Sequence, residues 1–553
     1  MFKARVLFFT ILGIFALIYL KLFYIQVMNE YASYGNDYLK TRQILPERGK
    51  IFDRNHEPLA VNQVVYRLFA EPKKIEDRNK LIKGIEDVLH IGEATLEARI
   101  DPSKVWAAVA NAVTANEKKK LESLQLKGIG FDEGYKRYYP EASLAAHLLG
   151  FVGKRDNGED GGYFGVEGYY DKDLAGLGGL LKSERDVMGN PILIGMQEKL
   201  DVQNGRDLML TIDKTVQDVV KQKLKNGIER YQAKDGCVIV AKPTSMEILA
   251  LSCLPDFDAD NYFKFGDDVY RNAAISNVYE PGSTFKPLVV ASAIEQKAIK
   301  PDDTYYEDGP VKIGEYSIKT WNDKYGGKMT ITNVLERSSN VGMVNIGRRM
   351  GDKKLLTAIK RFGFGELTGI DLQGEVPAYL RAEKDWYPID YATATFGQGI
   401  AVTPIQMITA FSSIINGGIL YRPTVIRATV DEGKEAVRQP EAVRRIVSEK
   451  TSAVMRKMLE STVENGEFKW AKPEGYRIGG KTGTAQIPIE GKYDPYKTVA
   501  SFIGFSPVDN PQFIAIVILR ETKTSPWGSE TAAPLFFDIA KELLVYYNIP
   551  PNK

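Results

Sequence analysis

The sequence predicts an α+β protein that carries a membrane-spanning helix at its N-terminus. Three observations support this prediction. The N-terminal residues form a long apolar segment, β-rich segments occur at residues 237–253 and 498–520, and helical patterns fill much of the chain between them. Strands at both ends of a domain with helices between them are typical of an antiparallel sheet flanked by helices.

The apolar segment at residues 6–27 contains one charged residue, Lys21. About 20 apolar residues span a bilayer as a helix. The alternative is a cleaved signal peptide, but the segment is longer than a typical signal core and no small-x-small cleavage pattern follows it. Lys3 and Arg5 precede the segment. We therefore expect residues 1–5 to be a cytoplasmic tail and everything after the anchor to be exported.

Residues 28–205 combine a helical pattern at 73–91 with glycine-rich segments at 157–165 and 174–181. Neither glycine-rich segment opens a β-α-β unit. We therefore predict loops there and no phosphate-binding site.

The second half of the chain begins with helical periodicity at residues 215–232 and a predicted β-hairpin at residues 237–253. Cys237 and Cys253 stand at the two ends of this hairpin. Because cross-strand disulfides strain the bond geometry, two buried free thiols are favoured, and a disulfide is the alternative.

Two further strands near the C-terminus are predicted at residues 498–507 and 512–520, joined by a turn at 508–511. An amphipathic helix is predicted at residues 534–548. These elements complete the predicted antiparallel sheet and its helical cover.

Composition excludes several classes of function. The 553 residues are 44% hydrophobic and 26% charged, which is ordinary for a globular protein and allows two to four domains. A net charge of +2 does not indicate a nucleic-acid partner. With two cysteines and three scattered histidines, the common zinc clusters are excluded, and we expect neither a metal nor a cofactor.

A candidate nucleophile lies in "EPGSTFKPLVV", where Ser283 precedes Lys286 by three residues. The histidines all lie early in the chain, so the base must be a lysine, a carboxylate, a tyrosine or a bound water. Residues three apart share one face of a helix, which makes Lys286 the simplest candidate. Burial and nearby positive charge favour its neutral form, which accepts a proton. Taken alone, Ser283 is better explained as a helix-capping serine.

Two further motifs follow in order: Ser338-Ser339-Asn340 and Lys481-Thr482-Gly483-Thr484. Their hydroxyl, amide and ammonium groups can transfer protons and bind a carboxylate. A glycine inside a strand, such as Gly483, indicates that another backbone approaches closely, as a substrate pairing along the strand edge would. Alone, Ser338-Ser339-Asn340 is a loop or helix cap, and Lys481-Thr482-Gly483-Thr484 is an exposed strand. Together with Ser283 and Lys286 they form an ordered set of three motifs, and this set is specific.

This set resembles the signature of penicillin-binding proteins and serine β-lactamases. Further segments resemble class B penicillin-binding proteins, which are membrane-anchored peptidoglycan transpeptidases, and the resemblance covers essentially the whole chain. These segments are Arg48–Ala60, Arg137–Gly153, Thr395–Gln406 and Ala532–Ala540. The family usually has glycine at His56, Glu141 and Met246, so local turn geometry is in doubt at these three positions.

The resemblance implies an elongated pedestal domain of the dimerisation type at residues 28–205. It also implies a transpeptidase domain with a serine β-lactamase-like fold at residues 206–550. Ser283 would attack the penultimate D-alanine of a stem pentapeptide, with Lys286 as the base. Ser338 or a lysine would protonate the leaving D-alanine.

The resemblance also assigns the remaining site residues. The backbone N–H groups of Ser283 and Thr484 would hold the oxyanion. Lys481, Thr482 and Thr484 would bind the substrate carboxylate, on the strand that contains Gly483, and Asn340 would contact the substrate backbone. An amine of a second stem peptide would complete the cross-link, and a β-lactam would acylate the same serine.

The implied location is the cytoplasmic membrane, with a single span and the catalytic domain outside the cytoplasm. The implied partners are a SEDS glycosyltransferase of the FtsW type and other divisome proteins. Division enzymes of the FtsI type usually carry S-S-N and K-T-G, as here, and no PASTA repeats are recognised, so a septal role is favoured. The alternatives are an elongation or sporulation enzyme, a β-lactamase or D,D-carboxypeptidase, and a non-catalytic β-lactam sensor.

Overall fold

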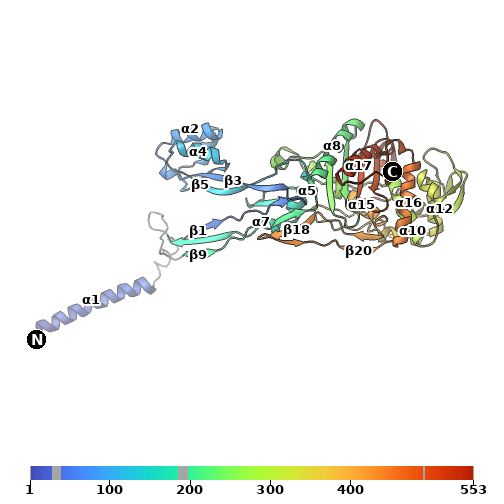
Figure 1. Ribbon diagram of the computed structural model, residues 1–553. Helices are drawn as coiled ribbons and strands as arrows, with labels where there is room; N and C mark the ends of the chain where they lie inside the picture. The colour runs from blue at the N-terminus through green and yellow to red at the C-terminus, as the bar shows by residue number, and fades with distance from the viewer. Residues whose placement is uncertain (1, 28–38, 185–196, 490–491, 552–553) are drawn as a thin grey trace.

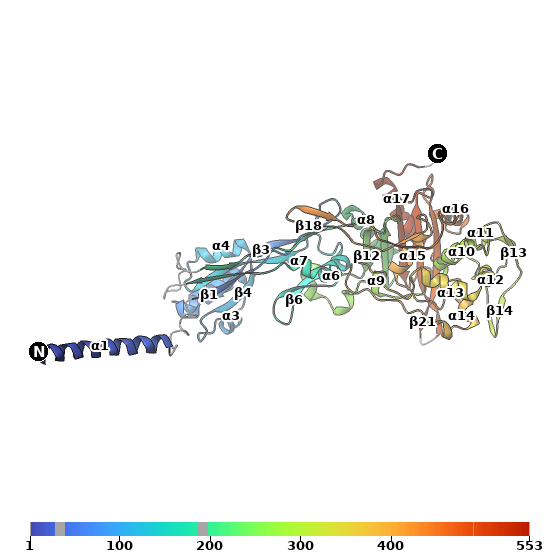
Figure 2. The same ribbon diagram turned by 90° about the horizontal axis from the view of Figure 1, so that it is seen from below.

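The computed structural model describes residues 2–27, 39–184, 197–489 and 492–551. The molecule is elongated, with helix α1 at one end, a narrow sheet-rich region in the middle and a larger α+β region at the other end (Figures 1 and 2). Helix α1 (Phe2–Val27) exposes its apolar side chains, and it is long and apolar enough to cross a membrane.

The middle region is built on a seven-stranded sheet. Its order is β19-β18-β10-β2-β3-β4, and β5 also pairs with β3. The strands are β2 (Ile51–Phe52), β3 (Pro58–Ala70), β4 (Ala107–Val113), β5 (Ile129–Tyr138), β10 (Asp207–Leu210), β18 (Ile426–Asp431) and β19 (Lys434–Val437). Two of these strands come from the second half of the chain, so the middle region is tied to residues far away in sequence.

Smaller elements surround this sheet. Helices α2 (Arg78–Leu89), α3 (Glu93–Arg99) and α4 (Ala115–Ser123) enclose a separate small core with β3 and β4. A three-stranded sheet has the order β1-β8-β9 and a two-stranded sheet pairs β6 with β7. The remaining elements are β1 (Leu39–Ile44), α5 (Ala146–Leu149), β6 (Phe151–Lys154), β7 (Asp160–Tyr163), α6 (Gly165–Tyr169), α7 (Asp171–Ala175), β8 (Gly179–Glu184) and β9 (Gln197–Leu200).

The prediction of loops at the two glycine-rich segments is wrong in part. Strand β7 and the start of α6 lie within residues 157–165, and β8 begins inside 174–181. Glycine weakens a strand but does not forbid one, and here β7 pairs with β6 while β8 pairs with both β1 and β9. Long-range pairing therefore outweighs the local preference for turns.

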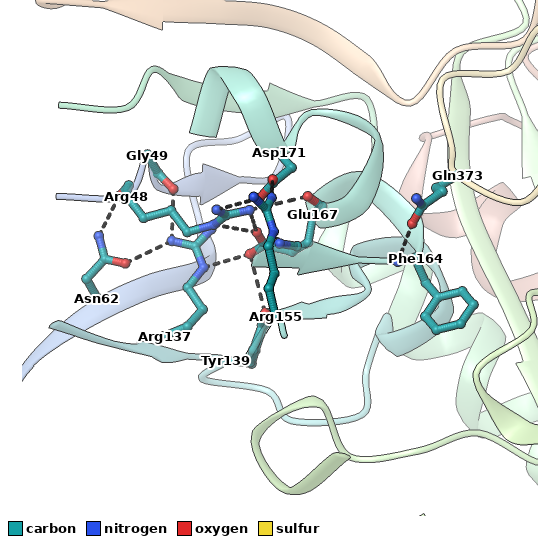
Figure 3. A network of polar contacts seen from close by, with 11 residues as sticks. Arg48, Gly49, Asn62, Arg137, Tyr139, Arg155, Phe164, Glu167, Asp171 and Gln373 are labelled. Carbon is teal, nitrogen blue, oxygen red and sulfur yellow. Dashed lines mark hydrogen bonds and ion pairs between the residues drawn. The ribbon is translucent and has the colours of Figure 1, made fainter. Parts of the chain in front are cut away.

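A buried ion-pair network holds the middle region together (Figure 3). Glu167 is fully buried and lies 2.6 Å from a guanidinium nitrogen of Arg48 and 2.7 Å from one of Arg137. Arg48 also lies 2.9 Å from Asp171, which pairs with Arg155 as well. Buried charges persist only when they are paired and hydrogen-bonded. The network thus joins the first residues of the two family-like segments that begin at Arg48 and Arg137.

The same region contacts the C-terminal part through two polar links. The backbone N–H of Phe164 donates to Oε1 of Gln373 at 2.6 Å, as Figure 3 shows. The hydroxyl of Tyr170 donates to the buried carboxylate of Asp371 at 3.0 Å. Arg438 donates to the same carboxylate at 2.9 Å. These links place the C-terminal part in a defined position on the sheet-rich region.

The C-terminal part contains a five-stranded antiparallel sheet of order β12-β11-β23-β22-β21. The strands are β11 (Asp235–Ala241), β12 (Ile248–Leu254), β21 (Gly479–Ile489), β22 (Lys492–Ser506) and β23 (Phe513–Arg520). Strands from both ends of this part form one sheet, so the predicted antiparallel sheet flanked by helices is confirmed.

Two apolar layers cover the sheet. Helices α8 (Lys214–Tyr231) and α17 (Ala532–Tyr546) pack on one face, where Val238 and Val240 point. Ile239 points to the opposite face, which joins the main helical core. This alternation is the period of two expected of a strand buried on both faces. Both predicted flanking helices are therefore confirmed.

The main core is enclosed by helices and short strands that lie in sequence between β12 and β21. The helices are α9 (Ala273–Ser276), α10 (Lys286–Glu295), α11 (Ile331–Glu336), α12 (Asn340–Met350), α13 (Asp352–Arg361), α14 (Pro388–Ala394), α15 (Pro404–Ser413) and α16 (Glu449–Asn465). The strands are β13 (Thr304–Glu307), β14 (Val311–Ile313), β15 (Tyr316–Ile318), β16 (Gly327–Thr330), β17 (Ile419–Tyr421) and β20 (Ala442–Arg445).

The favoured prediction of two free thiols is wrong. Cys237 and Cys253 are directly opposite each other in the β11–β12 register and form a disulfide. Their Cα atoms are 4.1 Å apart, because neighbouring strands bring opposed residues this close. The alternative, a cross-strand disulfide, is what the structure contains.

Two of the positions where the family usually has glycine keep a left-handed backbone. His56 has φ 68° and Met246 has φ 53°. A side chain in this conformation is uncommon and must be held by its surroundings. The turns are thus retained without glycine.

Candidate active site

Ser283 lies in a 3₁₀ turn, η4 (Gly282–Phe285), that leads directly into α10. Gly282 has φ 55°, and its N–H donates to the carbonyl oxygen of Gly397 at 3.0 Å. Pro287 lies in the first turn of α10, where backbone N–H groups have no partner within the helix, so it removes no helical hydrogen bond. The turn is therefore held at its start by Gly397 and at its end by α10, and it presents Ser283 at a helix N-terminus.

Lys286, the lysine of the first motif, is fully buried, and its amine contacts the second motif, Ser338–Asn340. It hydrogen-bonds to the carbonyl oxygen of Ser338 at 2.6 Å, to the hydroxyl of Ser338 at 3.1 Å and to Oδ1 of Asn340 at 2.9 Å. Burial lowers the pKa of Lys286 well below its usual value, and the charge of Lys481 lowers it further, while Glu307 raises it. The neutral amine that a general base requires is favoured here.

Lys481 on the edge strand β21 approaches the same hydroxyl from the other side. Its amine lies 3.1 Å from Oγ of Ser338 and 3.1 Å from the carbonyl oxygen of Thr482. Burial lowers the pKa of Lys481 to about 7, and Glu467 opposes this shift. Lys481 therefore carries a partial positive charge near neutral pH.

Ser338 is the point at which all three motifs meet. It lies in the turn between α11 and α12 with φ 54°, a left-handed conformation that few non-glycine residues adopt. A neutral lysine has two N–H donors and one lone pair. With Ser338 O and Asn340 Oδ1 accepting from Lys286, that lone pair is left for a hydroxyl group. The backbone N–H of Lys286 donates to the carbonyl oxygen of Ser283. Among the described residues, no hydrogen bond joins the hydroxyl of Ser283 to the amine of Lys286.

Gly483 and Thr484 bring β21 against the turn that carries Ser283. A Cβ atom at Gly483 would lie 2.9 Å from the carbonyl oxygen of Pro281 and 2.9 Å from Thr284. The side chain of Thr484 accepts a hydrogen bond from the N–H of Gly528 at 3.0 Å. A backbone thus approaches Gly483 closely, as predicted, but it belongs to the turn that carries Ser283 and not to a substrate.

Most of the motif residues line one cleft together with residues that the motifs do not include, whereas Lys286, Ser339 and Gly483 are not part of its lining. Trp321 and Trp527 lie in an edge-to-face arrangement at the cleft, with ring centroids 5.2 Å apart. The full lining is Gly282, Ser283, Trp321, Glu336, Arg337, Ser338, Asn340, Phe396, Gln398, Glu467, Phe468, Lys481, Thr482, Thr484, Trp527 and Ser529. Phe396 and Gln398 belong to the family-like segment 395–406, whereas no sequence signal marks the two tryptophans. Among the described residues, no group of three or more His, Cys, Asp or Glu is arranged to hold a metal ion.

The fold and the three motifs that meet at Ser338 define a protein of the penicillin-binding type. The family model "Penicillin binding protein transpeptidase domain" matches residues 236–541, and "Penicillin-binding Protein dimerisation domain" matches residues 43–210. The chain belongs to the class B penicillin-binding proteins, and it is a peptidoglycan D,D-transpeptidase.

Two curated relatives are similar along their length. The chain is 36% identical to Stage V sporulation protein D of Bacillus subtilis, over 100% of this chain and 87% of the relative. It is 31% identical to peptidoglycan D,D-transpeptidase FtsI of Escherichia coli, over 93% of this chain and 86% of the relative. A solved peptidoglycan synthetase from Bifidobacterium adolescentis has a TM-score of 0.76 and 27% identity, covering 93% of this chain and 98% of that one.

Proposed function

We propose that this protein is a membrane-anchored transpeptidase that cross-links peptidoglycan stem peptides through an acyl-enzyme on Ser283. The observation that carries the proposal is the convergence of the amines of Lys286 and Lys481 on the hydroxyl of Ser338, beside the turn that holds Ser283.

In the first step, Oγ of Ser283 attacks the carbonyl carbon of the penultimate D-alanine. The neutral amine of Lys286 accepts the hydroxyl proton as the O–C bond forms. The C–N bond to the terminal D-alanine then breaks, and the leaving amine takes a proton from Ser338. Ser338 is restored by the proton on a lysine, because both lysines hydrogen-bond to it.

The negative charge on the carbonyl oxygen is held by the backbone N–H groups of Ser283 and Thr484. Losing one such donor costs about 10²–10³-fold in rate. The charge of Lys481 and the hydroxyls of Thr482 and Thr484 bind the substrate carboxylate, on the strand that Gly483 keeps close to Ser283. Asn340 contacts the substrate backbone.

In the second step, the amine of another stem peptide attacks the ester and releases Ser283 by the reverse proton transfers. A β-lactam acylates Ser283 in the same way and remains attached. The substrates are thus a D-Ala-D-Ala donor and an amine acceptor.

The proposed setting is a cytoplasmic membrane. Helix α1 supplies an apolar segment of sufficient length, residues 1–5 remain in the cytoplasm and the residues after the anchor are extracytoplasmic. Residues 28–205 form the pedestal and residues 206–550 the transpeptidase domain. The partners are a SEDS glycosyltransferase of the FtsW type, which supplies the glycan, and other divisome proteins.

Septal peptidoglycan is the proposed product, supported by the similarity to FtsI of Escherichia coli. A sporulation role is a second candidate, because the identity to Stage V sporulation protein D is higher, 36% against 31%. Depletion of this protein in its host cells distinguishes the two roles. Filamentous growth would indicate a role in division, whereas normal growth with defective spores would indicate a role in sporulation.

The activity is tested with a soluble pentapeptide donor and a labelled D-amino acid acceptor. Transfer predicts a labelled product that forms together with released D-alanine and disappears in the Ser283→Ala variant. Release of D-alanine without labelled product would indicate a carboxypeptidase and contradict the proposal.

A further inference from the structure

We propose that Glu307 is a positioning residue of this transpeptidase, which fixes the turn of Ser338 against Lys286 through a hydrogen bond to Ser339. This inference rests on the proposed function of Ser283 and Lys286. Glu307 belongs to none of the three motifs and is the last residue of the short strand β13.

The carboxylate of Glu307 is buried and its contacts are specific. The residue is 2% exposed, and its Oε2 accepts hydrogen bonds from the hydroxyls of Tyr305 and Ser339. A buried carboxylate is costly unless hydrogen-bonded, so these two hydroxyls account for its stable placement.

Ser339 transmits the position of Glu307 to α12. Its hydroxyl has one hydrogen, which it donates to Glu307, and its oxygen accepts from the N–H of Gly342 at 2.9 Å as the N-cap of the helix. The carboxylate therefore lies close to the N-terminus of α12, where negative charge is favourable. A Cβ atom at Gly342 would lie 2.5 Å from the hydroxyl of Tyr305, so only glycine leaves room for this arrangement.

Ser338, the next residue back along the chain, needs this support. Its φ of 54° is strained for a serine and persists only where neighbouring groups impose it. On one side its carbonyl oxygen accepts from Lys286, and on the other Ser339 is held by Glu307. The backbone N–H groups of Ser338 and Ser339 also donate to the carbonyl oxygens of Leu335 and Val334. Releasing Ser339 from Glu307 removes the side-chain restraint on this side of the hydroxyl that both catalytic lysines contact.

The charge of Glu307 also raises the pKa of Lys286, so the pH dependence of acylation distinguishes loss of this charge from loss of the hydrogen bond to Ser339. Lys286 is faced by Lys481 on β21, which disfavours its protonated form, and by Glu307 on β13, which favours it. Lys481 is in turn faced by Glu467. Because neutral Lys286 is the base, removing the Glu307 charge moves the acid limb of the acylation pH profile to lower pH. Removing the Ser339 hydroxyl leaves that charge in place.

The experiment measures the second-order rate of acylation by a fluorescent penicillin between pH 5 and 10, with the full chain in detergent. Glu307→Gln and Ser339→Ala are each expected to slow acylation at the optimum by about 10- to 100-fold, the range typical of a small displacement of a catalytic group. Only Glu307→Gln should also shift the acid limb to lower pH. Melting curves of each variant give the folded fraction.

Glu295→Gln is a matched control. Glu295 accepts hydrogen bonds from the hydroxyl of Ser448, the N-cap of α16, at 2.8 Å and from Thr451. It thus repeats the arrangement of a carboxylate on a helix cap, away from the catalytic lysines. It should lower the melting temperature and leave the acylation rate unchanged.

The outcomes separate the two proposals. If wild type is not labelled at Ser283, the proposed function fails. If wild type is labelled and the Glu307 and Ser339 variants acylate within twofold of it, the inference about Glu307 is overturned. If Glu307→Gln does not fold, the Ser339→Ala variant alone tests the inference. Acylation of Ser339→Ala at the wild-type rate would then contradict the positioning role of Glu307.

Discussion

The amines of Lys286 and Lys481 share one hydrogen-bond partner, since each lies 3.1 Å from the hydroxyl oxygen of Ser338. Two buried lysines this close repel each other when both are charged, which favours the loss of one proton. The arrangement favours a neutral Lys286 and a partly charged Lys481, which suits the roles of base and carboxylate ligand that we propose for them.

The acylation rate is expected to have a bell-shaped pH dependence. The rate rises as Lys286 loses its proton, at a pH well below the usual lysine value. It falls as the pH increases through about 7, because Lys481 then loses the charge that binds the carboxylate. Stopped-flow acylation from pH 5 to 10 checks this profile. In Lys481→Arg the falling limb should disappear, since arginine stays protonated; a falling limb that remains near pH 7 would contradict the role of Lys481.

Replacing Lys286 with arginine should abolish base catalysis while retaining a long cationic side chain. Arginine cannot accept a proton at these pH values, so acylation should fall by about 10²–10⁴-fold. The matched control is Lys312→Arg, an exposed position on β14. A Lys286→Arg variant that acylates at the wild-type rate would show that another group takes the proton of Ser283.

The Gly483→Ala variant tests the fit between β21 and the nucleophile's turn. The added methyl group would lie 2.5 Å from Oγ of Ser501 and 2.9 Å from Pro281 O, so the turn must move. We expect a loss of stability of about 1–3 kcal/mol, as for other overpacked sites, and a larger loss of acylation. Gly266→Ala meets nothing within 4 Å and should change neither quantity. Normal acylation by Gly483→Ala would mean that the turn tolerates displacement.

The buried network of the middle region predicts a large stability effect at Glu167. Glu167→Gln leaves Arg48 and Arg137 without their shared carboxylate, which should cost about 3–5 kcal/mol of unfolding free energy. The measurement is chemical denaturation of the folded protein. Glu76→Gln removes an ion pair of similar length, 2.8 Å, that is exposed to solvent and should leave the midpoint unchanged. Equal midpoints for the two variants would show that the network is not a stabilising element.

Local sequence patterns predicted much of the fold. The apolar segment became α1, the turn at 508–511 joins β22 to β23, and the final helical pattern became α17. Each of these depends on periodicity or turn chemistry within a few residues. The three motifs were also visible in the sequence, because their spacing and order are specific.

Long-range pairing was not predictable in the same way. Strand β18 joins the sheet of the middle region by pairing with β10, and β19 pairs with β18, although two of the three motifs lie between β10 and β18 in sequence. Glu307 was missed because one carboxylate on a four-residue strand has no motif, and its role arises only where β13 meets the start of α12. The disulfide was the disfavoured alternative, because cross-strand bonds were expected to be strained and the sequence leaves open the register that places the two cysteines opposite each other.

The most direct test of the central claim is to locate the acyl group. Purified protein is incubated with a fluorescent penicillin, digested with trypsin and analysed by mass spectrometry, with Ser283→Ala in parallel. The account predicts a long-lived adduct on the peptide that contains Ser283, and no adduct in the variant. An adduct on another serine, or equal labelling of the variant, would contradict the assignment of Ser283 as the nucleophile.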